Sequence, residues 1–159
     1  MRRVAYLLVA CSLVVSAMAA ESGRSEGAVT IDKTRIDLGY AYAVGHQRND
    51  ITKRKDDVKV VLTDKALDPA IDLNEIGTLL PADVHALIFN VSSQQKITHV
   101  ELLYPKGSYD GGYLEDTPDF RFKSSNPGRG SIGGKVTSGK VQTNTMTFQV
   151  DADFTAAIK

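Results

Sequence analysis

The chain has 159 residues, of which 42% are apolar, 24% charged and 7% aromatic, and its 19 basic residues balance its 19 acidic ones. This composition excludes a disordered, collagen-like or coiled-coil protein and predicts one ordinary globular domain. A near-neutral chain without a basic stripe also lacks the clustered Lys and Arg that neutralise phosphates, so we expect no nucleic-acid partner.

The N-terminus predicts export. Arg2 and Arg3 precede an apolar stretch over residues 4–15, and Ala17-Met18-Ala19 has the small-x-small pattern of a signal-peptidase site. We therefore expect a signal peptide over residues 1–19, cleaved after Ala19 or Ala20, and a periplasmic or secreted protein. The apolar stretch is shorter than the roughly 20 residues that cross a bilayer, so no transmembrane span is predicted in the mature chain.

An alternative for the same segment is lipidation. Leu8-Val9-Ala10-Cys11 resembles the lipobox of bacterial lipoproteins, but Cys11 lies in the middle of the apolar run, where a polar tether would be expected. Cleavage of a signal peptide removes Cys11 and leaves a mature chain without disulfides, thiol nucleophiles or thiolate metal ligands. We expect a flexible leader over residues 20–27 and a single β-sandwich domain over residues 28–159.

The remaining pattern is a series of short apolar alternations divided by turn residues, which is typical of half-buried strands. Strands are expected over residues 28–32, 35–46, 58–63, 84–91, 97–104, 119–123, 131–137, 140–143 and 146–158. The charged segment 47–57 and the segment 105–118 are expected to be loops. One short helix is expected within residues 66–81, because Asp72 is a good N-cap and Glu75 follows three residues later.

These elements predict an all-β fold: an antiparallel β-sandwich, immunoglobulin-like or partly closed as a barrel, of about eight strands with one short helix. In the segment 35–46 the even-numbered side chains form the expected core face. In the hairpin of residues 84–91 and 97–104 we expect Asn90 to stand opposite Thr98. Ile88 would then face Val100, which gives one continuous apolar face.

No catalytic, cofactor-binding or metal-binding residue is predicted. The run Gly128-Arg129-Gly130-Ser131-Ile132-Gly133 matches a dinucleotide-binding pattern, but Asn126-Pro127 precedes it and β-like residues follow, so it is interpreted as a turn. In the expected register His85 and His99 are about 13 Å apart, too far to share a metal. The acidic residues at 110–119 lack the spacing of an EF-hand, and Asp151 and Asp153 fit the solvent face of a strand.

A possible binding surface combines aromatic and imidazole side chains. Tyrosine offers an apolar face and a polar tip, which suits sugars and peptides. The candidate residues are Tyr104, Tyr109, Tyr113, His85 and His99.

Several strand patterns together resemble an uncharacterised group of small exported bacterial β-domain proteins. They are IDLGYAYAV at 36–44, VKVVLTD at 58–64, the hairpin at 85–105, SIGGKVT at 131–137 and FQVDADFTAAI at 148–158. The resemblance implies export and a β-fold and carries no functional residue.

Three functions follow as hypotheses. The first is an exported, non-enzymatic β-domain that binds an envelope protein or polysaccharide through loops and an edge strand. The second is a carrier of a small apolar ligand in a barrel-like cavity. The third is a hydrolase that uses His85 or His99 with Glu101. The sequence leaves the oligomeric state open.

Overall fold

The computed structural model describes residues 23–45, 57–113, 117, 119–125 and 127–159. The predicted signal peptide with Cys11, the start of the leader, the last residue of the predicted strand 35–46 and residues 47–56 of the charged segment lie outside this part of the chain. Among the described residues, no helix has the length and apolar character needed to cross a membrane.

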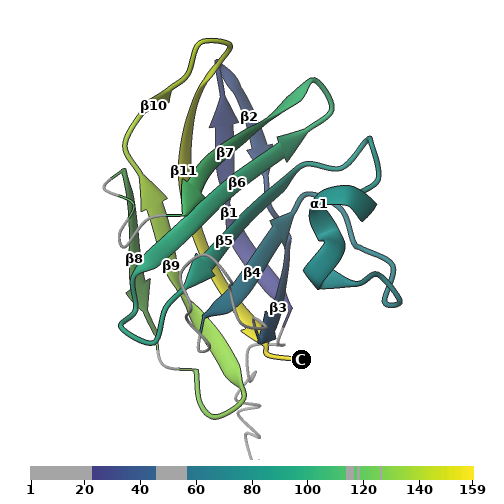
Figure 1. Cartoon of the computed structure of the whole chain (residues 1–159), viewed down its shortest axis with the longest axis vertical. Helices are drawn as coiled ribbons and strands as arrows, with labels where there is room; N and C mark the ends of the chain where they lie inside the picture. Colours follow the sequence, from purple (N-terminus) through teal and green to yellow (C-terminus); the bar gives the residue numbers. More distant parts are fainter. Residues whose placement is uncertain (1–22, 46–56, 114–116, 118, 126) are drawn as a thin grey trace, which may run out of the picture.

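The described residues form one large antiparallel sheet that curls into a half-barrel (Figure 1). Its strands run in the order β7-β6-β5-β4-β3-β1-β11-β9-β8, with β2 paired to β1 and β10 paired to β11. The strands are β1 (Arg24–Ile31), β2 (Thr34–Asp37), β3 (Tyr40–Gly45), β4 (Val58–Thr63), β5 (Ala86–Val91), β6 (Ile97–Tyr104), β7 (Gly107–Tyr113), β8 (Phe120–Ser124), β9 (Ser131–Ser138), β10 (Val141–Gln142) and β11 (Thr147–Ala157). The predicted antiparallel β-fold with one short helix is confirmed, whereas a sandwich of about eight strands is not.

The concave side of the sheet holds the main core. β11 alternates strictly, so that Phe148, Val150, Ala152 and Phe154 are buried there, as its sequence pattern predicts. Phe154 meets Phe89 of β5 across the core, with ring centroids 5.5 Å apart in an edge-to-face arrangement. The intervening side of β11 carries the exposed Asp151 and Asp153, as expected.

An interruption of the strand at residues 38–39 changes which face of the segment 35–46 is buried. Leu38 is fully buried in the main core, but β3 starts only at Tyr40, and Ala41 and Ala43 take the core positions there. The prediction that the even-numbered face is the core face is therefore wrong for β3. The irregular residues between β2 and β3 shift the side-chain alternation by one position, which moves every later side chain to the opposite face.

The register of the β5–β6 hairpin also differs from the prediction by one residue. Asn90 pairs with His99 and Ile88 with Glu101, and a bulge between Asn90 and Val91 absorbs the difference. Phe89 and Val100 face the main core, so the odd-numbered side of β5 is the core side. The predicted pairing of Asn90 with Thr98 is wrong, because the extra residue of the bulge cannot be read from alternation alone.

Two segments expected to be irregular are strands. β1 begins at Arg24, inside the range predicted as a leader, and Gly27 lies within it because a Cβ there would be 2.3 Å from the Cα of Ala152. β7 occupies half of the segment predicted as a loop over residues 105–118. In both cases the strand contains glycine and polar residues, which give no apolar alternation in the sequence. The strands form nevertheless, because their pairing depends on backbone hydrogen bonds.

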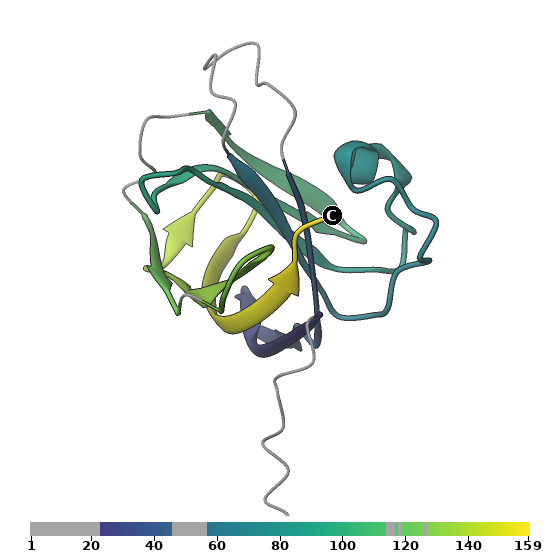
Figure 2. The same ribbon diagram turned by 90° about the horizontal axis from the view of Figure 1, so that it is seen from below.

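A covering segment between β4 and β5 packs on the convex side of the sheet (Figure 2). It contains a 3₁₀ turn, Leu73–Glu75, and the helix α1, Ile76–Leu79, and Asp72 caps the turn by accepting a hydrogen bond from the Asn74 N–H at 2.9 Å. Leu73 and Ile76 are buried against Val61 and Ile88 of the sheet. The predicted short helix is confirmed. Asp72 caps the 3₁₀ turn, whereas α1 follows Glu75 without a side-chain cap, and Leu79 is 50% exposed instead of facing the core.

Candidate functional site: a polar cluster on the convex face

The convex face of the sheet changes from apolar to polar along the strands β4, β5 and β6. Val61, Ile88 and Leu103 belong to the apolar cluster beneath the covering segment. One row further along, Lys59 of β4 pairs with Asn90 of β5, and Asn90 pairs with His99 of β6. Residues in direct register project to the same side of a sheet, so these side chains lie side by side on the convex face.

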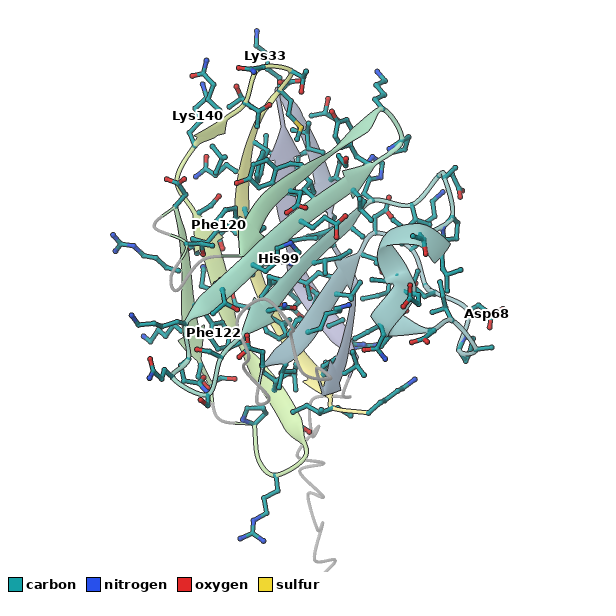
Figure 3. The ribbon with its side chains drawn as sticks, in the orientation of Figure 1. Lys33, Asp68, His99, Phe120, Phe122 and Lys140 are labelled. Carbon is teal, nitrogen blue, oxygen red and sulfur yellow. The ribbon has the colours of Figure 1, made fainter. Side chains whose placement is uncertain are left out.

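Glu101 and Asp110 extend this group. Glu101 lies two residues beyond His99 on β6 and pairs with Asp110 of β7, so both are on the convex side. Figure 3 shows His99 near the middle of the sheet, with α1 across β5 and β4 from it. We call Lys59, Asn90, His99, Glu101 and Asp110 the convex-face cluster.

A cavity of about 220 Å³ lies between this cluster and the covering segment. The sheet contributes Lys59, Ile88, His99 and Glu101 to its wall, and residues 74–78 form the opposite wall. A pocket below the roughly 300–1,000 Å³ that suits drug-sized ligands holds one small group.

Asn90 is the most unusual member of the cluster. Its side chain is fully buried, at 0% exposure, yet neither the Oδ1 nor the Nδ2 atom has a hydrogen-bond partner in the described structure. Burying an unpartnered amide costs free energy, and native structures contain few such groups. Both of its cross-strand neighbours, Lys59 and His99, line the cavity.

The His99 ring is held by a carboxylate. Its Nε2 atom lies 3.1 Å from Oδ1 of Asp110, and the same oxygen accepts a hydrogen bond from the Gly112 N–H at 2.8 Å. The Gly112 hydrogen bond and, to a lesser degree, the contact with His99 lower the pKa of Asp110 below its ordinary value. His99 is 6% exposed, so the imidazole has a defined position at the edge of the cavity.

Burial disfavours the charged forms of Lys59 and Glu101. Lys59 donates from Nζ to the backbone carbonyl of Asn74 at 2.8 Å, and burial lowers its pKa despite the nearby carboxylates of Glu101, Glu75 and Asp72. Burial likewise raises the pKa of Glu101, and the charge of Asp110 adds to that effect. Pairs of half-buried ionisable groups with such shifts gather at functional sites more often than elsewhere.

The covering segment leaves room above Glu101. A Cβ atom added to Gly77 of α1 would lie 3.7 Å from both carboxylate oxygens of Glu101, which is ordinary van der Waals contact. Any larger side chain at position 77 would therefore occupy the space in front of the carboxylate.

The five residues predicted as a binding surface are not brought together. His99 belongs to the convex-face cluster, and Tyr113 is its register partner on β7. The Nδ1 atom of His85 instead lies 2.7 Å from Oδ2 of Asp64, and Tyr104 packs against the main core. Tyr109 also turns to the concave side, where its ring is 4.9 Å from that of Phe148.

Sequence reasoning missed Lys59 and Asn90. Each is a polar residue inside a strand that is otherwise strongly apolar, VKVVLT and ALIFNV. That signal marks a buried polar position, but only the register shows that both residues flank one site with His99.

A second hollow, of about 380 Å³, lies at the glycine-rich turn between β8 and β9. Gly128 and Gly130 have positive φ angles of 115° and 72° there, as a turn requires. Among the residues of this hollow that the structure describes, Arg129 is the only ionisable one, so the cavity at the convex-face cluster is the better candidate site.

No protein-family model matches the chain, and no curated protein or solved structure matches it either. The resemblance to small exported bacterial β-domain proteins therefore stays a prediction.

Proposed function

We propose that the protein is an exported, non-enzymatic binding module of the cell envelope, and that the cavity at the convex-face cluster is its ligand site. The observation that carries this proposal is the buried, unpartnered amide of Asn90 between two residues that line the cavity. An apolar residue at this position would make the protein more stable, so a destabilising polar group there is typical of a functional site.

The size of the cavity supports recognition of one small polar unit. Its walls offer both donors and acceptors, and Ile76 and Ile88 add apolar surface. A single repeating unit of an envelope polymer fits such a site, since polymers gain affinity by presenting many copies of the unit.

A hydrolase is the second candidate, favoured by one specific observation. Asp110 holds the His99 ring beside Glu101, a carboxyl group whose pKa is raised by burial, and such a pairing can serve acid–base chemistry. If the protein is a hydrolase, His99→Ala and Glu101→Gln abolish release of soluble fragments from an envelope polymer. If it is a binding module, the wild-type protein releases none.

The carrier hypothesis receives no support from the packing. Phe89, Phe148 and Phe154 fill the concave side of the curled sheet and are at most 4% exposed. We further propose that the half-barrel is partly closed at its open side, because the N–H and the hydroxyl of Thr117 both donate to the carbonyl of Ile97 on β6, at 3.1 and 3.2 Å. The segment just before β8 is thereby attached to β6.

Co-sedimentation with purified, insoluble bacterial cell-wall polymer tests the proposed function. We expect the wild-type protein to pellet with the polymer and Glu101→Gln to remain largely in the supernatant. Asp153→Asn is the matched control, since it removes a carboxylate that is 64% exposed on β11. Equal pelleting of all three proteins, or no pelleting of the wild type, would overturn the proposal.

A further inference from the structure

We propose that two copies of this chain form a weak, symmetric dimer through the convex face of β8, β9, β11 and β1, where the charges of one copy complement those of the other. This inference concerns a different part of the sheet from the convex-face cluster and does not depend on the proposed ligand site.

One row of charged side chains crosses these four strands. Lys123 of β8 pairs with Lys135 of β9, Lys135 pairs with Asp153 of β11, and Asp153 pairs with Glu26 of β1. Neighbouring residues of the same strands, among them Val136, belong to the main core, so the row lies on the convex face. We call these four residues the charge row.

The order of charges in the charge row is unfavourable within one chain. Lys123 stands beside Lys135, and Asp153 stands beside Glu26. Like charges directly opposite each other on neighbouring strands destabilise a sheet. The one pair of opposite charge is loose, because the Lys135 Nζ atom lies 2.8 Å from Asp151 and 3.8 Å from Asp153. Alternating signs at the same four positions would give every charge an opposite neighbour.

The two outer charges of the row lack partners among the residues that the structure describes. The side chains of Lys123 and Glu26 are exposed and form no ion pair or hydrogen bond there. The next row has the same polarity, since Arg121 lies on β8, Thr137 on β9 and Asp151 on β11. Along these two rows the β8–β9 half is therefore basic and the β11–β1 half is acidic.

A second copy of the chain fits this pattern. A twofold axis that lies in the plane of contact, parallel to the strands and between β9 and β11, places the basic half of each copy on the acidic half of the other. Lys123 then faces the partner's Glu26, and Lys135 faces the partner's Asp153, in both directions. Such a contact uses the same surface on both copies and closes at two.

The face is open to such a partner, but the contact is small. The covering segment packs on the other part of the sheet, against β3 to β6 (Figure 2), and the Asp151 and Asp153 side chains are 66% and 64% exposed. The surface is convex, and the charge row spans only about 14 Å at the ordinary strand spacing. A contact below roughly 1,200 Å² is typical of transient complexes, so we expect a weak dimer that salt dissociates.

Sedimentation velocity of the mature chain tests the inference, at protein concentrations up to about 0.5 mM and in about 0.02 M and about 0.5 M NaCl. At the lower salt concentration we expect the sedimentation coefficient to rise with protein concentration toward that of a dimer. At the higher one it should remain that of a monomer. Lys123→Glu and Glu26→Lys should each weaken the dimer by about tenfold or more, because each variant brings like charges together twice.

Exchange of charges distinguishes this contact from a general effect of net charge. An equimolar mixture of Lys123→Glu and Glu26→Lys should dimerise at low salt, because position 123 of each variant faces the opposite charge at position 26 of the other. The double variant Lys123→Glu/Glu26→Lys should dimerise for the same reason. Lys106→Glu is the matched control, since it makes the same change of net charge at an exposed residue of the β6–β7 turn, and it should dimerise like the wild type. Circular dichroism checks that each variant is folded.

A wild-type protein that stays monomeric at low salt would overturn the inference and leave this face to a different partner. A dimer that survives Lys123→Glu would place the contact elsewhere, and equal loss in Lys106→Glu would assign it to net charge. Failure of both the mixture and the double variant to dimerise would contradict the twofold arrangement. Each of these three results would refute the proposed dimer without bearing on the ligand site.

Discussion

Replacement of Asn90 by leucine should stabilise the protein. Leucine has the same branch point as asparagine, so it fills nearly the same space in β5 without any polar atom. Asn90 is 0% exposed and both polar atoms of its amide are unpartnered, so the wild-type protein carries the full desolvation cost of both.

That cost is about 1–3 kcal/mol for each buried, unpartnered group, or about 2–6 kcal/mol for the pair. The methyl groups of leucine are larger than the amide atoms, and overpacking in a dense interior costs about 1–3 kcal/mol. The net expectation is a gain of about 1–3 kcal/mol in the free energy of unfolding. Near the transition this corresponds to a rise in Tm of roughly 4 °C for each kcal/mol.

Urea denaturation at pH 7 measures the change, with the m-value as a check that the unfolding transition is unaltered. Asn144→Leu is the matched control on an exposed site and should change stability by less than about 0.5 kcal/mol. Asn90→Ala should be near neutral, because it removes the same penalty and leaves a small cavity. Losses of more than about 2 kcal/mol in both Asn90 variants would mean that the amide is hydrogen-bonded, and would refute the reasoning.

Three further changes test other parts of the structure. Burial raises the pKa of Glu101 above its ordinary value of 4.5. The free energy of unfolding should therefore fall as the pH rises from 4.5 through the raised pKa. Glu101→Gln should remove this pH dependence, as measured by chemical denaturation at a series of pH values. Gly77→Ala should raise stability by about 0.5–1 kcal/mol in a thermal melt, because alanine favours helix, yet weaken pelleting with cell-wall polymer by covering the Glu101 carboxylate. Gly134→Ala should cost at least about 2 kcal/mol in urea denaturation, since its Cβ would lie 2.3 Å from the Lys123 carbonyl oxygen at a φ of 154°, and a neutral effect would contradict this geometry.

Most strands could be predicted from their β-branched and apolar residues. β4 and β6 occupy the predicted ranges, 58–63 and 97–104, because both are short runs rich in β-branched and apolar residues. β11 is long and strictly alternating, and its buried and exposed faces follow its sequence pattern. β7 could not be predicted in this way, because its glycines and polar residues have no such period.

Faces and register were harder to predict than strands. The bulge at Asn90 and Val91 and the irregular residues between β2 and β3 each add one position, and one position reverses the face of every residue beyond it. The candidate site depends on this register. Lys59, Asn90 and His99 are far apart in the sequence, and only the pairing of β4, β5 and β6 places them in one row.

The side-chain amide of Asn90 provides the most direct test of the proposed ligand site, because its neighbours Lys59 and His99 line the cavity. Its two N–H signals can be assigned in a ¹⁵N-labelled protein by their loss in Asn90→Leu, and then followed while soluble fragments of cell-wall polymer are added. Binding at the convex-face cluster predicts saturable shifts of these signals together with the backbone signals of His99 and Glu101. Saturation of the protein by the fragments without any shift of these signals would place the ligand elsewhere and contradict the account.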